Sequence, residues 1–165
     1  MRNLLLAMAF VLTAVSVNAQ AYDGTGDQKM QIGANFQKYG TGIVVTYDYG
    51  VGENFSIGVV SSYVLGVKES VDKDFDSRID LKARFNANLG SVLQLGNNVD
   101  VYPGLNLGLK NFGGHLGARY FFSDGFGIFT EFTTPIAKFK TRDLTPAEKL
   151  HNQFVFSIGA SFNLN

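Results

Sequence analysis

The sequence lacks cysteine and tryptophan, and only three of its 165 residues are proline. Without cysteine the chain can form no disulfide and cannot be anchored as an acylated lipoprotein. It also lacks an excess of charge, because 14 lysine and arginine side chains balance 14 aspartate and glutamate side chains. This balance argues against nucleic acid as a partner. After residue 17 no apolar run is long enough for a membrane-spanning helix, which excludes a helical membrane protein.

The first 19 residues have the layout of an export signal. Met1-Arg2-Asn3 gives a positive start, Leu4 to Val17 is apolar, and Val17-Asn18-Ala19 ends in the small-residue pattern of a cleavage site. The alternative, a short membrane anchor, is disfavoured because the run is too brief to span and no stop-transfer charges follow. We therefore predict a cleaved signal peptide over residues 1–19, followed by a mobile periplasmic lead-in over residues 20–28.

The last stretch, residues 153–165, alternates strictly between apolar and small or polar residues. This period of two predicts a β-strand with one apolar face. The apolar positions are Phe154, Phe156, Ile158, Ala160, Phe162 and Leu164. No helical or further strand pattern follows that could cover this face from water, so we expect it to face lipid.

The same alternation recurs along the chain and predicts eight strands, enough for one domain over residues 29–165. Their expected ranges are 29–37, 42–51, 55–67, 77–89, 99–110, 115–122, 126–136 and 153–165. Two connections, residues 68–76 and 137–152, are long and charged and are predicted to be extracellular. Pro103 lies inside the fifth strand, where we expect a bulge or a break in the ladder. The predicted fold is all-β: an eight-stranded antiparallel up-and-down transmembrane β-barrel with a filled polar lumen.

The polar faces of the predicted strands carry charges of both signs, which a narrow lumen tolerates only as pairs. The predicted lumen network contains Asp48, Arg78, Asp80, Lys82, Arg84, Asp100, Lys110, His115, Arg119 and Glu131. The short turn at residues 123–125 aligns Gly117 with Glu131, and we expect Arg119 to meet Glu131 diagonally. Eight glycines share these faces: Gly33, Gly58, Gly66, Gly104, Gly108, Gly117, Gly127 and Gly159.

The alternative is a soluble barrel of the lipocalin type, with the apolar face around a ligand. Glycine argues against it, since glycine weakens a solvent-facing strand but makes room inside a narrow barrel. Aromatic residues on the apolar faces suggest a girdle at the membrane interfaces, although aromatics also suit strands in general. They are Tyr47, Tyr49, Tyr63, Tyr120, Phe122, Phe126 and Phe162.

Two segments carry a family resemblance. The spacing of Ser157, Gly159, Phe162 and Leu164 resembles the C-terminal assembly signal of outer-membrane barrels, and residues 114–132 are similar to two adjacent strands of small barrels of Bacteroidota. The chain thus resembles outer-membrane proteins of the broad OmpX and OmpA-barrel class. This resemblance implies location in the cell outer membrane, with outer-membrane lipid and the barrel-assembly machinery as partners.

Motifs for chemistry are not found in the sequence. It has no phosphate-binding glycine loop, no metal-ligand spacing and no Ser–His–acid grouping, so we predict no catalytic residue, no cofactor and no metal site. His115 is expected to be a partner in the lumen network. The predicted role is non-enzymatic, either structural or in surface binding through residues 68–76 and 137–152 to polysaccharide or to an envelope or host protein. The alternative is a lipid-modifying barrel enzyme acting on lipid A acyl chains.

Overall fold

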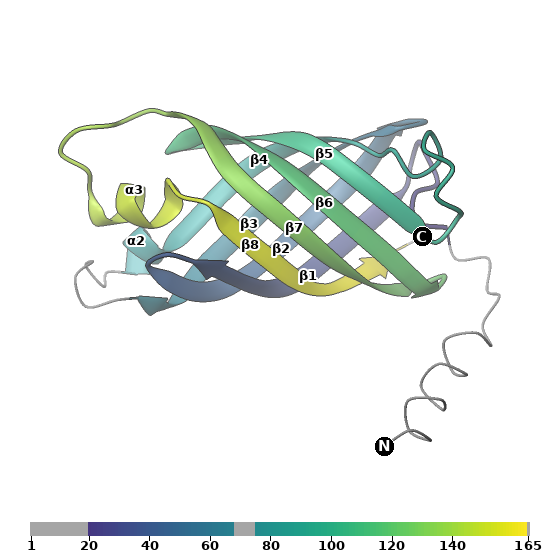
Figure 1. The fold of residues 1–165 in the computed structure, drawn as a ribbon, viewed down its shortest axis with the longest axis horizontal. Coiled ribbons are helices and arrows are strands. Elements are labelled where there is room, and N and C mark those ends of the chain that lie inside the picture. Colours follow the sequence, from purple (N-terminus) through teal and green to yellow (C-terminus); the bar gives the residue numbers. More distant parts are fainter. Residues whose placement is uncertain (1–19, 68–74, 165) are drawn as a thin grey trace, which may run out of the picture.

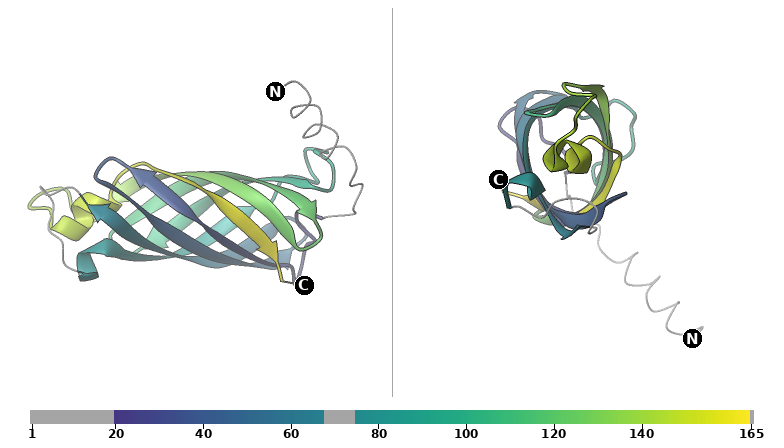
Figure 2. Two further views of the ribbon diagram at one scale, coloured as in Figure 1. Left: turned by 90° about the horizontal axis from the view of Figure 1, so that it is seen from below. Right: turned by 90° about the vertical axis from the view of Figure 1, so that its left-hand side faces the viewer.

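The computed structural model describes residues 20–67 and 75–164. The predicted signal peptide and most of the predicted loop 68–76 lie outside the described residues. Eight strands form one closed ring in which each strand pairs antiparallel with the next and β8 pairs back onto β1 (Figures 1 and 2). The strands are β1 Gln28–Gln37, β2 Gly40–Gly52, β3 Phe55–Val67, β4 Ile79–Ala87, β5 Val99–Gly108, β6 Asn111–Ser123, β7 Phe126–Lys138 and β8 Val155–Asn163. The predicted eight-stranded up-and-down barrel is confirmed.

The two ends of the barrel differ. One end, called the mouth below, carries two short helices, α2 Phe75–Arg78 and α3 Pro146–His151, and α3 lies within the ring when the barrel is viewed along its axis (Figure 2). The other end, called the base, carries the short turns at residues 53–54 and 124–125 and the segment 20–27. The longest connection, residues 139–154, therefore lies at the mouth, while the base also carries the long connection 88–98 between β4 and β5.

Several predicted boundaries were wrong around the fifth and sixth strands. The turn predicted at residues 111–114 is part of β6, and the chain instead reverses at Leu109 and Lys110. Gly113 and Gly114 pair with Pro135 and Thr134, so the glycines serve close strand packing instead of a turn. Lys110, predicted on a strand, consequently lies in the turn.

Pro103 interrupts one ladder and not the other. Pairing between β4 and β5 stops at Asn86 and Gly104, immediately before Pro103 in the direction of the base. The pairing of β5 with β6 continues through Pro103 and Leu116 without a shift. The predicted ladder break is confirmed, and it takes this form because proline has no N–H to donate on one side.

The segment predicted to be a mobile lead-in is ordered in the structure, and that prediction was wrong. Ala21 N–H donates to the Asn97 carbonyl at 2.6 Å, and Gly26 N–H donates to the Gly50 carbonyl at 2.8 Å. The Tyr22 hydroxyl donates to backbone carbonyls of the β2–β3 turn region, at 2.9 Å to Gly52. The segment thus closes the base, because its polar backbone finds partners at the strand ends.

Candidate functional site

The centre of the lumen is built around Arg84. Strand alternation turns Arg84 of β4 inward, where it is 3% exposed. Its Nε lies 3.3 Å from Asp48 Oδ1, and its Nη2 donates to Glu131 Oε2 at 3.0 Å. Asp48 comes from β2 and Glu131 from β7, so one guanidinium ties together three strands across the lumen. Two carboxylates around one buried cation stabilise its charge where water cannot.

Arg119 forms a second ion pair nearer the base. It lies directly opposite Asp100 on the neighbouring strand, and its Nη2 donates to Asp100 Oδ2 at 2.8 Å. Arg119 Nη2 also donates to Asn88 Oδ1 at 2.7 Å. The predicted Arg119–Glu131 pair was wrong, although the predicted alignment of Gly117 with Glu131 is confirmed. Arg119 forms its ion pair with its direct neighbour Asp100, while Glu131 reaches across the lumen and pairs with Arg84.

Tyr102 lies between the two guanidinium groups. Its ring centroid is 4.7 Å from the Arg119 Cζ and 5.5 Å from the Arg84 Cζ, and the ring is fully buried. The Tyr102 hydroxyl accepts from Gln31 Nε2 at 3.1 Å. Gly117 makes this possible, since a Cβ there would overlap the Tyr102 ring. The ring separates two like charges and stabilises both through its π-face.

His115 joins this layer as a hydrogen-bonding group. Its Nε2 lies 2.8 Å from Asn86 Oδ1 and 3.2 Å from Arg84 Nη2. A Cβ at Gly104 would overlap the His115 ring, so this glycine provides the space that the imidazole occupies. The structure thus places His115 next to Arg84, inside the network.

A second polar cluster lies at the mouth. Asp80 accepts two ion pairs, from Lys82 and Lys110, each at 3.3 Å. His151 of α3 approaches Asp80 with its Nδ1 at 3.8 Å, and its Nε2 lies 3.0 Å from the Ser77 carbonyl. Burial lowers the pKa of His151 to about 4, although Asp80 acts in the opposite direction. The imidazole is therefore neutral at pH 7.

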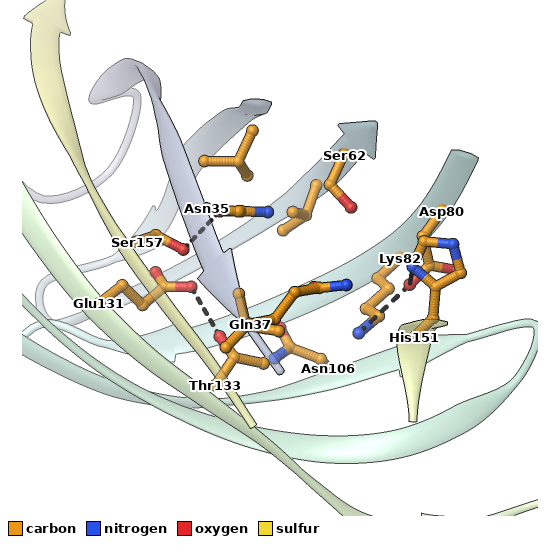
Figure 3. A pocket seen from close by; sticks show the side chains of 13 residues that line it. Asn35, Gln37, Ser62, Asp80, Lys82, Asn106, Glu131, Thr133, His151 and Ser157 are labelled. Atoms are coloured by element: carbon orange, nitrogen blue, oxygen red, sulfur yellow. Dashed lines mark hydrogen bonds and ion pairs between the residues drawn. The ribbon is translucent and has the colours of Figure 1, made fainter. Parts of the chain in front are cut away.

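Helix α3 closes the mouth. Leu150 is completely buried, and it packs with Val64 and Val67 of β3 and with Tyr39 of the β1–β2 connection. Asn111 Nδ2 also fixes the helix end by donating to the His151 carbonyl at 3.0 Å. Below it lies a cavity of about 40 Å³ whose lining includes Asp80, Lys82, Glu131 and His151 (Figure 3). A cavity of this size holds about three water molecules at most.

The base contains a further buried pair, Lys29 and Asp27, at 2.6 Å. The Lys29 ammonium also lies 5.3 Å from the centroid of the buried Phe121 ring. Near it, burial raises the pKa of Tyr22 to about 12. Sequence reasoning missed this cluster because it treated residues 20–28 as lead-in.

One predicted lumen residue falls outside the network. Arg78 is the last residue of α2 and is only half-buried. Its Nε has no hydrogen-bond partner among the described residues. The prediction was wrong because β4 begins at Ile79, two residues later than expected, so Arg78 is not held in the strand alternation.

The outer wall of the barrel is apolar. Twenty-two large hydrophobic side chains of the strands are exposed, among them Leu107 at 57%. Aromatic contacts gather in two places on this wall. Near the base are the pairs Phe55–Phe85, Tyr120–Phe122, Phe122–Phe126 and Phe126–Phe162. Near the mouth are the pairs Phe36–Phe156, Phe132–Phe156, Phe132–Phe154 and Tyr63–Phe75.

The residues of the predicted assembly signal lie on or beside β8. Ser157 Oγ donates to Asn35 Oδ1 at 2.7 Å inside the barrel. Gly159 lies against the backbone of Gly33, where no Cβ would fit. Phe162 contacts Phe126 on the outside with ring centroids 5.7 Å apart, and Leu164 is exposed just beyond the strand. Three of the four therefore contribute to the seams that close the ring.

The described part of the chain contains no cluster of three or more metal-binding side chains. None of its helices has the length and apolar character needed to cross a membrane. The buried charged side chains at the centre of the lumen pair with one another. This arrangement is suited to holding strands together.

Comparison with curated proteins and with solved structures finds no match. A family model matches residues 12–164, which is most of the chain. The chain therefore belongs to the family described as "Family of unknown function (DUF6646)".

Proposed function

We propose that this protein is an exported outer-membrane β-barrel with a non-enzymatic, structural role in the cell envelope and a binding surface at its mouth. The proposal rests above all on the polarity of the barrel wall. Ion pairs fill the interior, while most of the exposed side chains of the strands are aliphatic and aromatic. A water-soluble protein seldom exposes a continuous apolar surface of this extent. A hydrocarbon environment gives such a surface a stable location.

The position of the aromatic side chains supports the same proposal. Phe126 lies at the base end of β7, and Phe132 lies six residues, or about 20 Å along the strand, further towards the mouth. Aliphatic residues such as Ile128 and Ile158 are exposed between these two levels. Aromatic bands on both sides of an aliphatic band are typical of barrels that cross a membrane.

The predicted export signal and the resemblance to small outer-membrane barrels support the proposed location in the outer membrane. Both are consistent with a chain that crosses the inner membrane, is inserted by the barrel-assembly machinery and ends in outer-membrane lipid. The filled lumen argues for a structural role, because Arg84, Tyr102 and Arg119 occupy the space that a channel would need.

The binding part of the proposal rests on the connection between β7 and β8. Lys140, Arg142 and Lys149 are all exposed there, and Lys138 is exposed at the end of β7. The end of this connection is fixed on the mouth by α3, so the cations are held close to a rigid barrel. An anionic surface polysaccharide, or an acidic face of an envelope or host protein, is the partner that this charge would attract.

Location is tested by fractionation and by gel mobility. The protein should be recovered in the outer-membrane fraction and, in detergent, should migrate differently before and after boiling. Recovery in the soluble periplasm, with a mobility that boiling does not change, would overturn the proposal.

The role is tested by two measurements on cells. Replacing Lys140→Glu and Arg142→Glu should reduce binding of purified surface polysaccharide to vesicles that carry the barrel, without changing the amount of folded barrel. The mass spectrum of lipid A should be the same in a deletion strain and its parent. A changed acylation pattern would instead support the lipid-modifying alternative.

A further inference from the structure

The cavity beneath α3 is lined by hydrogen-bonding groups from several strands. Asn35, Ser62, Asn106 and Thr133 line it from β1, β3, β5 and β7, so that amides and hydroxyls surround the space (Figure 3). While α3 is docked, the volume of about 40 Å³ has room for water only. Because the lining is polar, a larger ligand that entered this space would be held by hydrogen bonds.

One group of this lining is left without a partner. Asn106 is only 3% exposed, and its Oδ1 accepts no hydrogen bond from any described residue. Such an orphaned acceptor is costly in a folded protein and calls for a donor. Lys82 lines the same cavity and forms one ion pair in the part of the chain that the structure describes, at 3.3 Å from Asp80 Oδ2. An ammonium has three N–H groups, so donors also remain for a ligand.

The roof of the cavity is a helix held by few contacts. α3 is six residues long, and only Leu150 and His151 of it are buried. Gln37 Nε2 donates to the Leu150 carbonyl at 3.0 Å, and Asn111 Nδ2 donates to the His151 carbonyl at 3.0 Å. Gln37 and His151 also line the cavity. Undocking of α3 would therefore enlarge the space and free the Gln37 amide to bind a ligand in it.

We propose that α3 is a displaceable lid and that the cavity beneath it binds one sugar unit of a surface polysaccharide. The inference rests on the proposed function, because it names the place at the mouth where the polysaccharide is held. A sugar hydroxyl both donates and accepts, so it suits the Asn106 oxygen as well as the Lys82 ammonium. A carboxylate in the same place would leave the Asn106 oxygen unpaired, since it has no hydrogen to donate. Val44 and Val60 offer apolar contact to the carbon atoms of the sugar ring.

The first test removes the orphaned acceptor. The barrel is refolded in lipid vesicles, and calorimetric titration measures binding of oligosaccharides released from the purified surface polysaccharide by mild acid hydrolysis. Asn106→Leu keeps the approximate size of the side chain and should weaken binding at least about 10-fold, because a buried hydrogen bond to the sugar is lost. The same substitution should not lower resistance to urea, since the Asn106 oxygen has no described partner to lose.

The second test concerns the lid. Leu150→Ala weakens docking of α3 and should strengthen oligosaccharide binding about 10-fold or more, because the open state that accepts the sugar is then more populated. Leu109→Ala is the matched control, the same change at an exposed leucine of the mouth, and should leave the affinity unchanged. A spin label on Lys149→Cys should become more mobile as oligosaccharide is added to saturation.

The outcomes separate this site from the proposed function. Unchanged affinity in Asn106→Leu overturns the cavity as the site. Weaker binding in Leu150→Ala, or saturation without a change in label mobility, overturns the lid, because the helix would then be part of the binding surface. If Lys140→Glu with Arg142→Glu still reduces binding of the intact polysaccharide in these cases, the proposed function stands. If neither the intact polysaccharide nor its oligosaccharides bind, both are wrong.

Discussion

The centre and the mouth of the lumen both contain buried ion pairs, but they are built differently. In the centre, Asp48, Arg84 and Glu131 project from three strands whose alternation fixes their direction. At the mouth, Asp80 meets Lys110 from a turn and His151 from α3. The centre thus belongs to the barrel wall, whereas the mouth depends on a helix that docks from a connection. A substitution at the centre should therefore affect the whole barrel, and a substitution at the mouth should affect only its closure.

The largest effect is expected from Arg84→Leu. It leaves Glu131 buried without its cation and Asp48 with only Arg119, 4.0 Å away, which should lower the free energy of unfolding by about 3–5 kcal/mol. Urea unfolding of the protein refolded in lipid vesicles measures it. The double variant Arg84→Met with Glu131→Met should recover much of the loss, since it removes charges of both signs. A loss below about 1 kcal/mol in the single variant would show that the centre does not hold the barrel.

The next effect concerns the mouth. Leu150→Ala removes the buried anchor of α3 and should weaken docking of the helix by about 2–4 kcal/mol. Because proteolysis follows the open population, trypsin should cleave after Lys149 at least about 30-fold faster. Leu109→Ala, at a side chain that is 84% exposed, is the control and should change nothing. An equal drop in global stability would contradict the distinction between closure and wall.

Protonation of His151 should make the docking of α3 depend on pH, with an effect similar to or smaller than that of Leu150→Ala. Burial lowers its pKa from 6.5 to about 4, so the docked helix favours the neutral imidazole. Docking should be full above pH 6.5, weaken as the pH falls to about 4, and change no further below that, with a maximal loss of about 3 kcal/mol. Asp80, Lys82 and Lys110 face the imidazole and set the size of the effect.

The measurement uses a spin label on Lys149→Cys, which is the only cysteine because the chain has none. Label mobility should increase between pH 6.5 and 4, and His151→Asn should remove this dependence. Mobility that is constant over this range, or a pH dependence that persists without His151, would contradict the assignment.

The smallest effect is expected on the surface. Lys140 Nζ and Glu148 Oε1 are 3.9 Å apart, and Lys140 is more than half exposed. Lys140→Gln should change the free energy of unfolding by less than about 0.5 kcal/mol, because exposed ion pairs contribute little. Urea unfolding again provides the measurement. A change above about 1 kcal/mol would mean that the connection is part of the barrel wall after all.

The barrel could be predicted from the sequence because one rule, alternation with a period of two, acts on every strand. The same rule placed Arg84, Asp100, Arg119 and Glu131 inside. It could not assign partners, because a guanidinium can reach a direct neighbour, a diagonal neighbour or a strand across the lumen. For this reason the predicted partner of Glu131 is Arg119, whereas in the structure Glu131 pairs with Arg84. Partner choice depends on the cross-section of the closed ring, which local spacing does not contain.

The helix that closes the mouth could not be predicted from alternation, but part of the signal for this helix is present in the sequence. Thr145 caps α3, Pro146 follows at the start, and Glu148 completes a capping box with its Oε2 2.8 Å from Thr145 N. Ser or Thr followed three residues later by Glu is a recognised signal for the start of a helix. The prediction of residues 137–152 as a loop rests on charge alone and does not use this signal. That Leu150 docks on Val64 depends on long-range packing and has no local signal.

The ring is complete only when Lys29 of β1 reaches Asn163 of β8, at opposite ends of the described chain. Until that last pairing forms, both terminal strands present rows of unsatisfied amide groups, which are templates for aggregation. Closure also brings together residues far apart in sequence, and such contacts form slowly. A barrel in which β8 has not yet met β1 is therefore a vulnerable open sheet until Gly33 and Gly159 come together.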